Sequence, residues 1–167
     1  MKVPTPRTSK TSGFSLVEMI IYMAVLILVA VMSVGALLGL QEVLAQYQAQ
    51  KLVQRSATTA LERILYEVRM ADSVTSASYA ADGSLTLENA GVPVLFATSS
   101  RALHITVDGE DLGALTDDRV TVDTLRFYNY DDVSEIVRVE LTLTGTIGDQ
   151  SVTRTFNAGT VLRNAYE

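Results

Sequence analysis

Gly13-Phe14-Ser15-Leu16-Val17-Glu18 is the stretch that decides the fold, because 22 residues without a charged side chain, Met19 to Leu40, follow it directly. A single carboxylate therefore lies at the start of a run that can cross a bilayer, since about 20 apolar residues span the hydrocarbon core. A charge in such a run costs free energy unless it finds a partner. We therefore expect Glu18 to have a specific function.

The residues before this stretch are basic. Lys2, Arg7 and Lys10 lie within residues 1–13, which contain no acid. Basic residues before an apolar span predict a cytoplasmic N-terminus. The pattern therefore predicts a targeting segment followed by one membrane span.

Three kinds of N-terminal segment are consistent with this pattern. A secretory signal peptide would be cut after the apolar run, near Ala45, although its apolar region usually has only about 7–15 residues. A plain single-span anchor would hold Glu18 near the lipid headgroups. A prepilin is cut before the apolar run, on the cytoplasmic side at Gly13, and keeps the apolar helix.

Residues 13–18 closely resemble the processing signature of type IV pilins and type II secretion pseudopilins: a Gly, a Phe, three small or apolar residues and a Glu. Met19-Ile20-Ile21-Tyr22-Met23-Ala24-Val25-Leu26 is also similar to that family. The resemblance implies that a prepilin peptidase cuts between Gly13 and Phe14 and methylates the new N-terminus at Phe14. It also implies an inner-membrane precursor, an assembly platform there, and later incorporation with other pilins or pseudopilins into a surface or periplasmic filament.

Cleavage at Gly13 would leave an α-ammonium group on Phe14, four residues before Glu18. That spacing is about one helical turn, so the two charges project from one side of a helix. Neither charge is tolerated alone in an apolar environment, whereas pairing offsets much of the desolvation cost. The resemblance implies that the pair forms between subunits, with Glu18 of the incoming subunit attracting Phe14 of the previous one.

The predicted helix continues beyond the apolar run. No proline occurs between Phe14 and Met70, and the pattern becomes amphipathic after Leu40. The apolar positions of this second part are Leu40, Leu44, Tyr47, Val53, Ala57, Ala60, Leu61, Ile64, Leu65 and Val68. We expect a leader at 1–13, a membrane or filament-core half at 14–40 and an amphipathic half at 41–71. Gly35 and Gly39, one turn apart, are candidates for close helix packing, or are simply weak points in the helix.

Residues 72–167, here called the head, have the pattern of short strands separated by turns. Residues 72–78 read as a linking loop, and Asp108-Gly109 is a strong hairpin signal. Alternation slips near Asp123, which predicts a bulge. Strand runs are expected at residues 85–87, 92–96, 103–107, 120–130, 137–144, 152–156 and 160–163. The expected fold is α+β: a long N-terminal helix packed on a C-terminal antiparallel β-sheet with one buried face.

A second, weaker resemblance concerns the end of the helix and the end of the chain. Residues 60–69 and 156–163 are similar to minor pilins and J-type minor pseudopilins. This likeness favours a minor subunit over a major one, and it implies a fold of the type IV pilin kind.

The sequence offers no support for an enzyme and implies no cofactor. The chain has no cysteine, which excludes disulfides and thiol nucleophiles, and its one histidine, His104, points to solvent on an expected strand. Five acids between residues 108 and 118 are candidates for calcium, although solvated turn acids are the favoured interpretation: Asp108, Glu110, Asp111, Asp117 and Asp118. Asp131, Asp132 and Glu135 form a second acidic group.

The net charge of the chain indicates which partners it can bind. The chain carries 19 acidic and 13 basic residues, a formal net charge of −6. Because binding to a phosphate backbone depends on Lys and Arg, this charge argues against nucleic acid as a bulk partner. A structural subunit of a filament is the expected function, and the alternatives are a filament-borne binding module for DNA, a surface or a secreted substrate, and a plain membrane-anchored protein.

Overall fold

The computed structural model describes residues 15–130 and 136–162. The chain divides into two compact units, one that ends at Gln41 and one that begins at Glu42. Gly13 and Phe14 lie outside the described residues, as do Asp131, Asp132 and Glu135.

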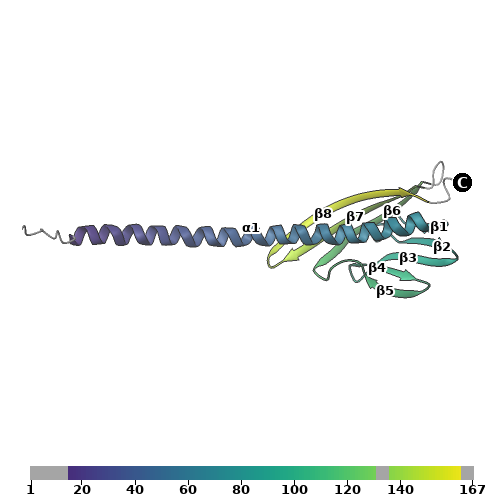
Figure 1. Cartoon of the computed structure of the whole chain (residues 1–167), viewed down its shortest axis with the longest axis horizontal. Helices are drawn as coiled ribbons and strands as arrows, with labels where there is room; N and C mark the ends of the chain where they lie inside the picture. Colours follow the sequence, from purple (N-terminus) through teal and green to yellow (C-terminus); the bar gives the residue numbers. More distant parts are fainter. Residues whose placement is uncertain (1–14, 131–135, 163–167) are drawn as a thin grey trace, which may run out of the picture. The chain divides into compact units, whose positions relative to one another are not determined.

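A single helix, α1, runs from Leu16 to Met70 and belongs to both units (Figure 1). The long helix is therefore confirmed over the described residues. Its continuity has a simple cause, since Leu, Ala, Met, Gln and Glu favour helix and no proline interrupts them. Glu18 in the first turn and Arg69 in the last turn also interact favourably with the helix dipole.

The second half of α1 supplies one wall of the hydrophobic core of the second unit. Its buried residues recur every three or four positions, which places them on one face of the helix. They are Ala49, Val53, Ser56, Ala57, Ala60, Ile64, Glu67 and Val68. The predicted apolar stripe is thus confirmed from Val53 onward, whereas Leu40, Leu44 and Tyr47 are exposed.

Eight antiparallel strands follow α1 (Figure 1). Five of them form one sheet in the order β1-β2-β3-β4-β5, and three form another in the order β6-β7-β8. Their bounds are β1 Ser73–Ala77, β2 Leu85–Asn89, β3 Val92–Ser99, β4 Ala102–Val107, β5 Glu110–Ala114, β6 Val120–Tyr130, β7 Ile136–Ile147 and β8 Gln150–Val161. The α+β fold, a long N-terminal helix followed by antiparallel sheet, is confirmed.

Two local predictions for the head are also confirmed. Asp108 and Gly109 have φ values of 52° and 81° and connect β4 to β5, as expected for a two-residue turn that requires positive φ at both positions. The register of β6 against β7 shifts between Val122 and Thr124, where alternation slips in the sequence. Asp123 is the residue left over at this bulge.

Three predictions for the head are wrong. Residues 73–77 form β1 rather than a linking loop, because their backbone pairs with β2 despite weak hydrophobic patterning. The strands form two sheets rather than one. Residues 150–161 form the single strand β8 rather than two short runs, because Gly159 pairs with Arg138 without interrupting the ladder.

Strand β5, with mostly exposed side chains, has no counterpart among the predicted strands.

A seam of backbone hydrogen bonds joins the two sheets. The loop between β1 and β2 bonds to β6 through Gly83 N–H to Leu125 O at 2.7 Å and Leu125 N–H to Ala81 O at 2.7 Å. Phe127 N–H also donates to Ser78 O at 3.0 Å. Leu125 and Phe127 are themselves buried in the core. The seam therefore fixes the two sheets as one head around a common core.

Candidate functional site

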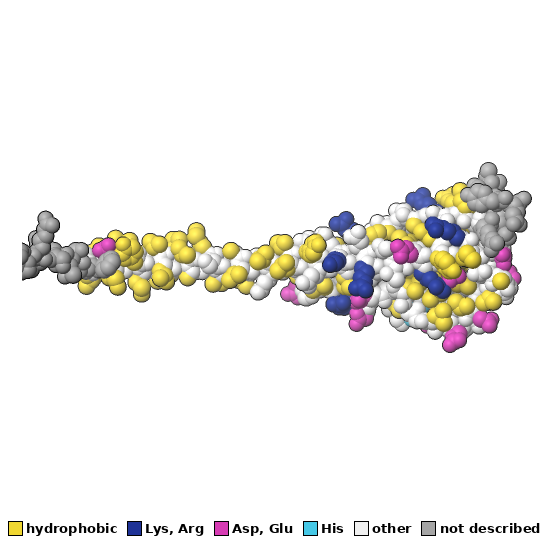
Figure 2. All heavy atoms as spheres, viewed as in Figure 1, with side chains coloured by type: hydrophobic (Ala, Val, Ile, Leu, Met, Phe, Trp, Pro, Cys, Tyr) yellow, Lys and Arg dark blue, Asp and Glu magenta, His cyan; other side chains and the backbone are white. Residues whose placement is uncertain are grey.

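The apolar half of α1 is the first candidate site, because nothing in the described chain covers it. By length and composition α1 can cross a membrane, and none of its most apolar stretch is buried. Large side chains such as Leu26 and Met32 are 65% and 68% exposed. Figure 2 shows this part of the helix covered with hydrophobic side chains. So much apolar surface in water is unfavourable, which calls for lipid or other helices around it.

Glu18 lies at the third residue of α1, partly buried at the start of this apolar surface. The Tyr22 hydroxyl donates a hydrogen bond to Glu18 Oε1 at 3.2 Å, and the two residues are one turn apart. The helix begins with Met19 N–H donating to Ser15 O at 3.1 Å, so the carboxylate lies in the first turn, near the positive end of the helix dipole. The structure thus gives Glu18 a local hydrogen bond and a favourable helix dipole, while its pairing with Phe14 stays a prediction.

Gly35 and Gly39 lie on one face of the apolar half. A Cβ atom added at either position would have nothing within 4 Å, so both glycines face open space. The helix is continuous across them. Nearby, Ser33 Oγ donates to Val29 O at 2.8 Å, which satisfies its hydroxyl within the helix. The glycine face is consequently available for close approach by another helix, as the small-residue spacing predicts.

His104 forms a side-chain hydrogen bond rather than facing solvent freely. Its neighbours Leu103 and Ile105 are buried on the other face of β4, as the alternation predicts. The imidazole is 24% exposed, and its Nδ1 lies 2.9 Å from Asp111 Oδ2 across the β4–β5 pair. The pKa of Asp111 is lowered, chiefly because the Gly113 backbone N–H donates to its carboxylate and secondly because of His104.

The five candidate calcium ligands are not brought together. Asp111 bonds to His104, while Asp117 bonds through Oδ1 to Arg119 Nε at 3.1 Å. Asp118 is 92% exposed and lies 3.7 Å from the same guanidinium. In residues 15–130 and 136–162 no group of three acidic or histidine side chains has the geometry to hold a metal ion.

Asp117 has a testable titration. Its pKa is lowered to about 2, chiefly because the Arg119 side chain donates to its carboxylate and also because the Arg119 backbone N–H does. A lowered pKa means that this contact stabilises the folded head fully above about pH 4, the range of an unfolded Asp, and is lost as the pH falls toward 2. NMR titration of the Asp117 carboxyl is expected to give a midpoint near 2, and Arg119→Gln should raise it. A midpoint near 4 in the unaltered protein would contradict this, and Arg126→Gln serves as the control.

The second candidate site is a group of cations that sequence reasoning missed, here called the basic face: Lys51, Arg55, Arg119 and Arg154. Lys51 and Arg55 come from α1, Arg119 precedes β6 and Arg154 lies on β8. Figure 2 shows dark-blue side chains gathered over the part of α1 that belongs to the head-bearing unit. The only sequence signal was the i,i+4 spacing of Lys51 and Arg55, because the fold brings the other two from distant segments.

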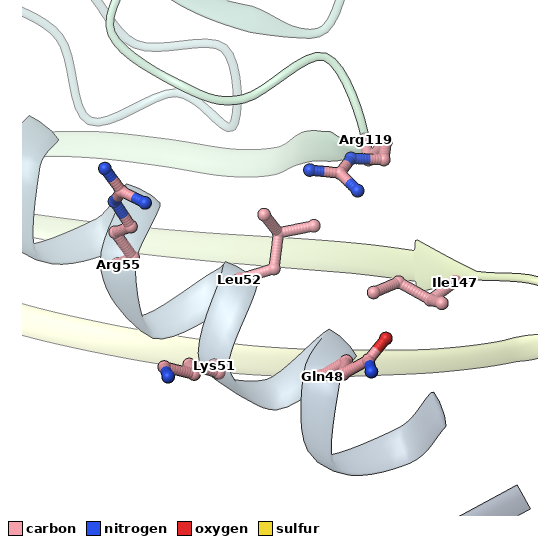
Figure 3. A pocket seen from close by; sticks show the side chains of 6 residues that line it. All are labelled: Gln48, Lys51, Leu52, Arg55, Arg119 and Ile147. Carbon is pink, nitrogen blue, oxygen red and sulfur yellow. The ribbon is translucent and has the colours of Figure 1, made fainter. Parts of the chain in front are cut away.

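A hollow of about 230 Å³ lies in the basic face. Figure 3 shows Arg55 and Arg119 on either side of Leu52, with Ile147 beside them and Lys51 and Gln48 on the helix below. Two further hollows adjoin the same turns of α1, one beside Thr58 and Thr59 and one beside Arg154. The arrangement offers cationic walls around an apolar floor.

Comparison of the chain with protein families, with curated proteins and with solved structures found no match.

Proposed function

We propose that this chain is a subunit of a type IV filament, a minor pilin or a type II secretion pseudopilin, made as a prepilin with a leader at residues 1–13. The observation that carries the proposal is the Gly-Phe-Ser-Leu-Val-Glu stretch at the junction of a basic leader and an apolar helix. Its expected partners are a prepilin peptidase, other pilins or pseudopilins, and an assembly platform at the inner membrane. The proposed role is structural and not enzymatic.

The arrangement of α1 supports this proposal. Its first half is exposed and apolar, and its second half is packed into a β-rich head. A helix of this kind can exchange one apolar environment for another, lipid before assembly and neighbouring helices afterward, at little cost in hydrophobic free energy. A partner charge on the neighbouring helix would then select the correct stagger, because an unpaired Glu18 in that environment is unfavourable.

A plain single-span anchor is the competing function, and processing separates the two. We expect Gly13→Val to block removal of residues 1–13 when the full chain is produced together with a prepilin peptidase, because the larger side chain obstructs the cut. The measurement is the mass of the membrane-bound product. Gly39→Val is the matched control, since it makes the same change in open space further along α1. Equal processing of both variants, or no processing of the unaltered chain, would favour the plain anchor.

A further inference from the structure

The basic face gathers four cations in a chain that is acidic as a whole, and one of them, Arg119, contacts Asp117 and Asp118. The first of its three hollows is lined by Gln48, Lys51, Leu52, Arg55, Arg119 and Ile147. The second is lined by Lys51, Gln54, Arg55, Thr58 and Thr59. The third is lined by Gln50, Gln54, Arg154 and Phe156. None of these lining residues is an Asp or a Glu. The face is therefore locally positive and fits a negatively charged partner.

Most of this positive charge is not used within the described chain. The side chains of Lys51, Arg55 and Arg154 form no ion pair or hydrogen bond with residues 15–130 or 136–162. By contrast, Arg63 is paired with Glu67 at 2.6 Å and Arg126 with Glu140 at 3.4 Å. Arg119 is partly neutralised by Asp117. Three cations consequently remain available for an external anion.

The chain keeps the basic face close to the membrane that the apolar run can cross. Leu40 ends that run, and Lys51 follows only eleven residues later in the chain, so the span tethers the basic face to the membrane by a short segment. Headgroups extend about 5–8 Å beyond the hydrocarbon core. A tether of eleven residues therefore raises the effective concentration of headgroup phosphates at the basic face.

The side chains that line the basic face indicate which class of anion it fits. Arg and Lys side chains bind phosphate oxygens, Arg through two parallel N–H groups and Lys as a point charge. Leu52, which lies between Arg55 and Arg119, and Ile147 give the hollow an apolar part (Figure 3). A lipid presents a phosphate next to an apolar glycerol and acyl region. The phosphate would contact the cationic walls of the hollow, and the apolar region would contact Leu52 and Ile147.

We propose that the basic face binds the phosphate groups of anionic lipids at the surface of the membrane that the apolar run spans, and so holds the head against that surface. The proposal depends on the membrane span and not on the processing signature. It predicts that the head leaves the surface when the salt concentration rises, because the attraction is between exposed charges.

The test uses the full chain in lipid nanodiscs. The chain has no cysteine, so Thr59→Cys at the exposed edge of the basic face can carry a single fluorophore. Lipids with a nitroxide on the headgroup quench this fluorophore when the head lies on the surface. We expect strong quenching in nanodiscs with about one-third anionic lipid, weak quenching in neutral ones, and loss of the difference at high salt.

Charge removal decides whether the basic face is responsible. Each cation near an anionic surface raises the binding constant about fivefold, so Lys51→Gln with Arg55→Gln should lower the ratio of bound to free head about 25-fold. Arg69→Gln with Arg138→Gln removes the same charge elsewhere and should change the ratio less than about twofold. Equal quenching in neutral and anionic nanodiscs, or an equal loss in the control pair, would overturn the proposal. Binding of a polyglutamate peptide to this face without any response to lipid charge would overturn it in favour of an acidic protein partner.

Discussion

Glu18→Ala is expected to lower incorporation of this chain into filaments at least about tenfold, while membrane insertion and removal of residues 1–13 continue. Removing one partner of a buried ion pair typically costs about 3–5 kcal/mol, since the other charge is left uncompensated. Insertion should be unaffected because Met19 to Leu40 supplies the apolar length. The measurement compares the variant in sheared filaments with the variant in membranes, by immunoblot against the unaltered chain.

Two further substitutions separate the charge of Glu18 from its local contacts. Glu18→Gln keeps an acceptor for the Tyr22 hydroxyl and a side chain suited to the first turn of α1, but removes the charge. We expect it to fail like Glu18→Ala. Tyr22→Phe removes the hydroxyl that donates to Glu18 but keeps the Glu18 charge, so it should incorporate nearly normally. Normal incorporation of Glu18→Gln would contradict the charge-pairing mechanism and leave Glu18 a local role at the helix start.

Gly83→Ala is expected to destabilise the head by roughly 2–4 kcal/mol, a large change for a single methyl group. A Cβ atom at Gly83 would lie 2.6 Å from Leu125 O and closer still to Ser78 O, and both are backbone atoms that cannot swing aside. These atoms belong to the seam between the two sheets, where Gly83 N–H donates to Leu125 O. Relief of the clash must therefore separate the β1–β2 loop from β6.

Unfolding of the full chain in detergent, followed by the circular dichroism of its strands, measures this effect. The matched control is Gly159→Ala, where an added Cβ atom would make ordinary contacts of 3.5 Å and longer with β7. We expect the control to change the free energy of unfolding by less than about 1 kcal/mol. Equal stability of Gly83→Ala and Gly159→Ala would show that the seam accommodates a side chain, contrary to the packing described above.

The main features of the fold follow from local sequence patterns. An apolar run without proline predicts the helix, and Asp108-Gly109 predicts a hairpin because its φ values suit few other residues. Strands β1 and β5 were not predicted from such patterns. Both lie at the edges of the five-stranded sheet, with mostly exposed side chains, so backbone pairing rather than hydrophobic alternation defines them.

The division into two sheets could not be read from the sequence for a related reason. It depends on where the β1–β2 loop meets β6, a contact between residues more than 40 positions apart. Of the two candidate sites, one is visible in the sequence and the other is not. Glu18 stands out because one charge in an apolar run is a local signal, whereas the basic face exists only after folding has brought Arg119 and Arg154 to the helix.

The most direct test of the proposed function is mass spectrometry of the N-terminal peptide of the protein recovered from the membranes of its own cells. We predict a chain that begins at Phe14 and carries one methyl group on its α-amino nitrogen. A chain that still begins at Met1, or one cut near Ala45, would contradict the assignment to the prepilin class.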